Sequence, residues 1–230
     1  GMFGACLMAK PQLVADCVRA MVDASDIPVT VKHRIGIDDM EHYEELVGFI
    51  EPIAAAGCSV FIVHARKAWL QGLSPRQNRE IPPLNYPWVY QLKKDFPDLT
   101  IVINGGVQTL EECQKHLAKV DGVMLGREAY QNPWMLAQVD SAIYGMDNTV
   151  NSRDDIISGL LPYVERQLAS GVHLNHITRH ILGLYQGVPG ARKFRRHLSE
   201  NAYKKGAGID VLIDAFDLVR QDGAHCAPYA

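Results

Sequence analysis

The chain has 230 residues, of which 47% are hydrophobic and 21% are charged, and its formal net charge is −3. This is the composition of an ordinary soluble globular protein, long enough for one large core or two modest ones. No apolar run is long enough to cross a membrane and no basic-then-apolar leader opens the chain, so we expect neither an anchor nor a secretion signal. The cysteines are scattered, odd in number and without metal-ligand spacing, which favours a reduced, cytoplasmic protein; they are Cys6, Cys17, Cys58, Cys113 and Cys226.

Predicted strands and helices alternate through the first part of the chain. Runs rich in β-branched residues, each closed by small or polar residues, predict strands buried on both faces at 27–32, 59–64, 100–104 and 121–126. Helical spacing of apolar residues predicts helices at 11–24, 38–56, 86–95, 110–118 and 134–144. Parallel strands joined by helices form a barrel or a doubly wound sheet, and polar groups at every strand end favour the barrel. We therefore predict an α/β fold, the C-terminal half of a (β/α)8 TIM barrel with about four βα units.

The last part of the chain predicts helices only. Residues 146–153 are polar and read as a linker, and apolar residues then recur at helical spacing over 154–169, 175–185, 191–204 and 211–219. We predict two domains, a partial barrel over 1–147 and a small all-helical C-terminal domain over 148–230. Between Arg179 and Lys205 seven Lys/Arg residues face one acid, Glu200, a local basic patch that points weakly to a polyanionic partner.

The ends of the predicted strands carry the groups of chemical interest. Lys32 and His64 end the first two strands, Asn104-Gly105-Gly106 follows the third, and Gly126-Arg127 follows the fourth. Backbone N–H groups without a Cβ in the way, beside a fixed cation, form a phosphate cradle. FMN fits this arrangement, with its phosphate on the glycines and Arg127 and its polar ring edge on Lys32 and His64. Taken singly, each group also has a structural interpretation, such as an ordinary turn or a solvated strand end.

A long polar loop, from residue 68 to about residue 83, interrupts the α/β pattern. It contains Arg76 and Arg79 and ends in two prolines. A polar loop of this length within a compact α/β pattern is more often functional than neutral.

Several segments of the chain together resemble a known family. They are FGACLM, PVTVKHRIGIDD, VHARKAWLQGLSPRQNREIPPL, IVINGG and DGVMLGREAYQNP, which span most of residues 1–145. The sequence resembles the tRNA-dihydrouridine synthases, and within them the A-type bacterial group. The resemblance implies an FMN-dependent reductase in which NADPH reduces the flavin. The flavin passes a hydride to C6 of a flipped-out uridine at position 20 or 20a of the tRNA D-loop.

The resemblance also implies roles for individual residues. It assigns FMN binding to Lys32, His64, Asn104, Gly105, Gly106, Gly126 and Arg127. It assigns tRNA binding to Arg76 and Arg79 in the loop and to Lys193 and Arg196 in the helical tail. The proton donor of the family is a cysteine in an Asn-x-x-Cys-Pro-Ser motif, expected upstream of Gly1, so we assign no catalytic residue within this chain.

The chain resembles roughly the C-terminal two-thirds of the family. Cys6 matches the cysteine of the family's own FGACLM segment and is not expected to be the acid. His173, His176 and His180 fall at helical spacing, but no carboxylate or cysteine pattern completes a site, so we expect no metal.

Three functional hypotheses remain open at this stage. The first is the flavoenzyme, and the second is a catalytically inactive fragment of it that lacks the proton donor. The third is another barrel enzyme acting on a phosphorylated metabolite, for which the long loop and the basic tail have no evident use. Because half a barrel leaves two sheet edges open, we also expect a homo-oligomer that covers them.

Overall fold

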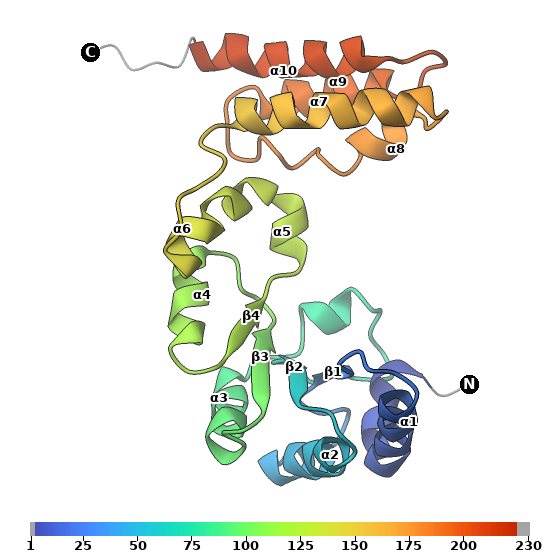
Figure 1. The fold of residues 1–230 in the computed structure, drawn as a ribbon, viewed down its shortest axis with the longest axis vertical. Coiled ribbons are helices and arrows are strands. Elements are labelled where there is room, and N and C mark those ends of the chain that lie inside the picture. Colours follow the sequence, from blue (N-terminus) through green and yellow to red (C-terminus); the bar gives the residue numbers. More distant parts are fainter. Residues whose placement is uncertain (1–2, 225–230) are drawn as a thin grey trace. The chain divides into compact units, whose positions relative to one another are not determined.

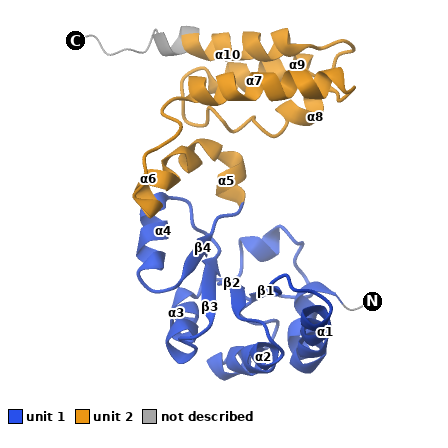
Figure 2. Cartoon of the chain, in the orientation of Figure 1, with its two compact units in different colours: residues 1–126 blue, residues 127–230 orange. Residues whose placement is uncertain are grey.

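The structure is a computed structural model that describes residues 3–224, with side chains described as far as residue 220. Cys226 lies outside the described residues. The chain forms two compact units, Gly1–Gly126 and Arg127–Ala230 (Figure 2). The predicted domain boundary after residue 147 falls inside the second unit. The reason is that residues 127–145 bond to later helices: the Arg153 guanidinium lies 4.4 Å from the Trp134 ring, and the Tyr130 hydroxyl contacts His180.

A four-stranded parallel sheet organises the first unit (Figure 1). Its strands are β1 (Thr30–Arg34), β2 (Val60–His64), β3 (Thr100–Asn104) and β4 (Gly122–Met124), in the order β1-β2-β3-β4. The predicted α/β class with a parallel sheet is confirmed. Strands that lie side by side in chain order occur in barrels, whereas doubly wound sheets reverse direction at a switch point. The half barrel itself stays a prediction.

Helices connect the strands of this sheet. They are η1 (Gly4–Ala9), α1 (Pro11–Asp23), α2 (Tyr43–Ala55), η2 (Gln77–Arg79), α3 (Tyr86–Asp95) and α4 (Leu110–Leu117). Local sequence fixes where they begin: Thr109 and Glu112 form a capping box at α4, and the Asn85 side chain accepts a hydrogen bond from the Trp88 N–H at α3.

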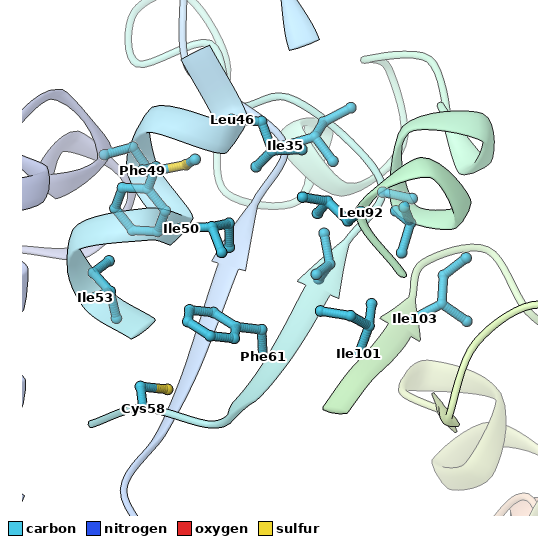
Figure 3. Close-up of a cluster of buried hydrophobic side chains, with 14 of the residues drawn as sticks. Ile35, Leu46, Phe49, Ile50, Ile53, Cys58, Phe61, Leu92, Ile101 and Ile103 are labelled. Carbon is cyan, nitrogen blue, oxygen red and sulfur yellow. The ribbon is translucent and has the colours of Figure 1, made fainter. Parts of the chain in front are cut away.

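One face of the sheet is packed and the other is not. Phe61 and Ile101 are fully buried beneath Ile50 of α2 and Leu92 of α3 in one cluster of apolar side chains (Figure 3). Because side chains alternate along a strand, residues one position away lie on the opposite face. Those residues stay partly or fully exposed, and they include the polar groups of the predicted site.

The first strand lies two to three residues later than predicted. Its ladder begins at Thr30, which pairs with Val60, and continues to Arg34. Pro28 has no N–H to contribute to a ladder, which disfavours the earlier start. Lys32 therefore lies in the middle of β1, and Arg34 occupies its carboxyl end.

The second unit contains only helices among its described residues. They are α5 (Arg127–Gln131), η3 (Pro133–Gln138), α6 (Val139–Tyr144), α7 (Arg153–Ala169), α8 (Leu174–Thr178), α9 (Ala191–Asn201) and α10 (Ile209–Ala224). Its core centres on Phe194, which stacks on Phe216 with ring centroids 5.6 Å apart and meets Tyr185 edge-on at 5.0 Å. None of the described helices is both long and apolar enough to span a bilayer.

Candidate functional site at the carboxyl ends of the strands

The register of the sheet brings three predicted residues to one face. His64 pairs with Asn104 on the neighbouring strand, and Lys32 pairs with Ile62, two residues before His64. Since residues two apart on a strand share a face, Lys32, His64 and Asn104 all lie on the face that the helices leave uncovered.

Side-chain hydrogen bonds link three strands on this face. The Lys32 ammonium donates to Oδ1 of Asn104 at 3.0 Å, and Nδ2 of Asn104 donates to the carbonyl oxygen of Met124 at 2.7 Å. The bond to β4 fixes the orientation of the amide, so its oxygen faces Lys32. Partial desolvation and the nearby Arg34 guanidinium lower the pKa of Lys32 from its usual value.

Gly105 and Gly106 form a tight backbone bend directly after β3. Their φ angles are +117° and +74°, in the region that favours glycine. A Cβ at Gly105 would lie 2.7 Å from Cδ2 of His64, and one at Gly106 would lie 2.7 Å from Cδ1 of Leu84. Both positions therefore exclude side chains, and the backbone is bare at this point.

Tyr86 fixes the direction of the peptide between these glycines. Its hydroxyl donates to the carbonyl oxygen of Gly105 at 2.7 Å. In a planar trans peptide the next N–H points opposite the carbonyl, so the Gly106 N–H is turned away from Tyr86. Among the described residues, the N–H groups of Gly105 and Gly106 have no backbone acceptor. Two donors are thus oriented and available to an anion.

The last two predicted cofactor residues follow β4. A Cβ at Gly126 would meet no atom within 4 Å, so packing does not explain the glycine there, and space is left against its backbone. Arg127 is exposed and begins α5, as the first residue of the second unit.

A cavity of about 470 Å³ opens beside β1. Lys32 and His64 line it together with His33 and with apolar side chains of η1 and α2, among them Met8 and Phe49. Pockets of this size and composition hold small organic ligands. The cavity therefore extends the polar face into a space that an apolar ring could enter.

Two arginines that sequence patterns did not single out hold the long loop. Nη1 of Arg34 donates to the carbonyl oxygens of Lys67 at 2.9 Å and Asn78 at 2.7 Å. Nη1 of Arg66 donates to the carbonyl oxygen of Glu80 at 3.2 Å and also to that of Pro82. Desolvation and the charges of Arg66 and Arg79 lower the pKa of Arg34. A cluster of cations therefore lies beneath the loop.

The predicted tRNA-binding residues lie on exposed surfaces of both units. The side chain of Arg76 is 82% exposed and lies 3.7 Å from Glu80, and Arg79 is the last residue of η2. Lys193 and Arg196 are exposed on α9, where Arg196 lies 3.4 Å from Glu200. In the part of the chain that the structure describes, no group of three or more His, Cys, Asp or Glu side chains could hold a metal ion.

The residues present fit a flavin phosphate. The glycine bend offers oriented N–H donors where a Cβ would intrude, Lys32 offers a cation that Asn104 positions, and the adjoining cavity offers apolar walls. These features define a class, an α/β protein whose ligand site lies at the carboxyl ends of parallel strands.

Comparison with known proteins identifies the family within that class. The dihydrouridine synthase (Dus) family model matches residues 1–220, and the chain belongs to this family. It is 61% identical over 222 residues to the tRNA-dihydrouridine(20/20a) synthase of Shewanella oneidensis, covering 96% of this chain and 66% of that protein. It is also 61% identical over 220 residues to the enzyme of the same name from Escherichia coli strain K12, covering 95% and 64% respectively.

The chain thus spans about two thirds of the length of these relatives. Among solved structures, mandelate oxidase resembles it with a TM-score of 0.40 and 13% identity, over 98% of this chain and 72% of that one. A TM-score at this level does not establish a shared fold.

Proposed function

We propose that this chain is the flavin- and tRNA-binding part of a cytoplasmic tRNA-dihydrouridine synthase. The enzyme reduces uridine to 5,6-dihydrouridine at positions 20 and 20a of the tRNA D-loop, with FMN as cofactor and NADPH as electron source. Family membership and the names of the relatives support the reaction. The observation that carries the cofactor is the bare Gly105-Gly106 bend, with its oriented N–H groups, beside the Lys32–Asn104 pair.

In this proposal the chain holds FMN at both ends of the molecule. The N–H groups of Gly105 and Gly106, the backbone at Gly126 and the Arg127 guanidinium bind the phosphate, because amides and guanidinium groups are strong phosphate donors. Lys32, His64 and Asn104 face the polar edge of the ring. When bound and reduced, FMN supplies the hydride that saturates the C5–C6 double bond of uridine.

Lys32 acts on the charge of the cofactor. A cation beside the polar ring edge stabilises the negative charge of the reduced flavin. Asn104 keeps the ammonium in place and is itself held by the backbone of β4, so the cation is positioned before any ligand binds. The positions of both groups therefore derive from the register of the sheet.

The tRNA contacts in this proposal come from Arg76 and Arg79 in the loop and from Lys193 and Arg196 on α9. Taking a uridine out of its stack costs a few kcal/mol, which contacts to the RNA offset. Exposed Lys and Arg side chains bind phosphates and position the RNA without reading its sequence. The high exposure of Arg76 is consistent with such a role.

Flavin titration tests the cofactor assignment. We expect fluorescence quenching to show tighter binding of FMN than of riboflavin, which lacks the phosphate, and Gly106→Ala to weaken FMN binding by at least about tenfold. Gly206→Ala is the matched control, since Gly206 has a φ of +81° but open space around a Cβ. Equal binding of FMN and riboflavin, or equal effects of the two variants, would contradict the assignment.

We also propose that the chain forms a homo-oligomer. Among the described strands, β1 pairs only with β2 and β4 only with β3, so each has one open edge. Open edges bind further strands, and one face of the sheet lacks helices. A monodisperse monomer in sedimentation velocity would rule this out.

A further inference from the structure

A cleft of about 780 Å³ in the second unit is lined by basic side chains. It lies between α5, the segment after α8 and the start of α9. Three arginines line it, Arg179, Arg192 and Arg195, together with Tyr130, His180 and Gly190. No Asp or Glu is among its lining residues, and within residues 3–220 none of the three arginines has a carboxylate at ion-pair distance. The cleft therefore concentrates positive charge that the described protein does not neutralise.

A short chain of hydrogen bonds sets the orientation of Arg179. Its Nε donates to Nε2 of His180 at 3.0 Å, and Nδ1 of His180 lies 2.9 Å from the Tyr130 hydroxyl. Because Nε2 accepts, the proton of the neutral imidazole is on Nδ1 and is donated to Tyr130. The Tyr130 hydroxyl in turn lies 3.5 Å from the Arg179 carbonyl oxygen. This arrangement uses only Nε of the guanidinium and leaves its two terminal nitrogens for a ligand.

Helix α9 presents the other two arginines on one side. Arg192 and Arg195 are three residues apart, so they lie one above the other, while Phe194 and Leu198 are buried on the opposite side. Lys193 and Arg196, which the sequence assigned to RNA, do not line the cleft. The helix begins after Gly190 without a side-chain cap, so its first N–H groups add positive potential at the same place.

We propose that this cleft binds a phosphodiester group of tRNA, an inference that rests on the proposed function and adds a site to it. Arginine forks bind phosphate oxygens in pairs, and three of them converge here with one pre-positioned. Tyr130 is 56% exposed at the rim and offers a ring against which a neighbouring base can stack. The ring favours a nucleic acid over an acidic peptide, which would use the cations alone.

Salt-dependent binding to an unmodified tRNA transcript tests the site. With the full chain, we expect Arg195→Ala and Arg192→Ala each to weaken binding by about tenfold. We expect each also to reduce the slope of log K against log salt by about one, as the loss of one phosphate contact predicts. Tyr130→Phe keeps the ring and removes the hydroxyl that orients His180, so a smaller loss is expected, with the salt slope unchanged.

Arg166→Ala is the matched control, because Arg166 is exposed on α7, outside the cleft, and its loss changes the net charge equally. Equal losses in Arg166→Ala and Arg195→Ala would overturn the site and show general electrostatic attraction. A loss of poly-glutamate binding in Arg195→Ala with tRNA binding unchanged would also overturn it, in favour of an acidic protein partner. Failure of the unaltered chain to bind tRNA would instead contradict the proposed function, and thermal melting identifies any variant that fails to fold.

Discussion

The two units hold their polar groups in different ways. On the sheet, Lys32 and Asn104 are placed by strand register and by bonds that run from β1 across to β4. In the helical unit, Arg192 and Arg195 stand on an exposed helix side, and only Arg179 is oriented by neighbours. Groups fixed in place suit a small ligand of defined shape, whereas long mobile cations suit a polymer with repeating charges. The two units are therefore expected to differ in salt sensitivity, in pH response and in their tolerance of mutation.

Independent unfolding of the two units is the sharpest test of this comparison. Phe194 is fully buried and contacts both Tyr185 and Phe216, so Phe194→Ala should cost the helical unit about 3–5 kcal/mol. We expect a separate, lower melting transition by calorimetry, with FMN affinity retained. Phe61→Ala, in the core of the sheet unit, should have the opposite pattern. Loss of FMN binding in Phe194→Ala would show that the units depend on each other.

Acid should destabilise the sheet unit through a buried histidine. His33 is 7% exposed between Phe49 and Phe61, and burial lowers its pKa from 6.5 to about 4. The unfolded chain therefore takes up a proton first as the pH falls, and stability declines between about pH 6.5 and pH 4. The loss amounts to about 3 kcal/mol at most.

Urea unfolding across this pH range measures the effect of His33. In His33→Gln the decline should shrink, leaving the smaller share of His116, whose pKa burial also lowers. An unchanged pH dependence in this variant would exclude His33 as the cause.

Removing the positioned cation should weaken flavin binding. Lys32→Met loses a charge-assisted contact and should reduce FMN affinity by about tenfold or more. Because the pKa of Lys32 is lowered, affinity in the unaltered chain should begin to fall at a lower pH than an ordinary lysine would give. Fluorescence titration at several alkaline pH values checks both points. Lys94→Met, at an exposed position on α3, should leave affinity and its pH profile unchanged.

The smallest expected effect concerns the direction of one peptide. Tyr86→Phe removes the hydrogen bond to the Gly105 carbonyl and should weaken FMN binding by about 1 kcal/mol, because the Gly106 N–H is then less firmly oriented. Tyr90→Phe is the control, since the Tyr90 hydroxyl bonds Nδ1 of His116 and not the glycine bend. Equal FMN affinities in the two variants would show that Tyr86 does not orient the cradle.

The sequence predicted the elements that have strong local signals. Helix α3 was predicted with its observed bounds, and the strands ending at His64 and Asn104 end where the apolar runs stop. The start of β1 was wrong because pairing with β2, and not local composition, decides where the ladder begins. Helix α8 is shorter than its periodic pattern, and α5 was not predicted, being five residues long.

The candidate site was predictable only where one strand end carries one group. Lys32, His64 and Asn104 share a face as the alternating pattern requires. The roles of Arg34 and Arg66 depend on carbonyl oxygens far along the chain, such as Asn78 and Pro82, which no local pattern indicates. The arginine cleft likewise requires α5 beside the start of α9, a contact between distant segments.

The order of the strands also bears on how the chain acquires its fold. Each strand pairs with the one made just before it, so no pairing waits for a segment synthesised much later. Successive pairings each close a loop of one βα unit, and loop closure of that size adds only a modest entropic barrier at each step. During synthesis, the sheet can therefore grow strand by strand from β1 to β4 before α9 and α10 leave the ribosome.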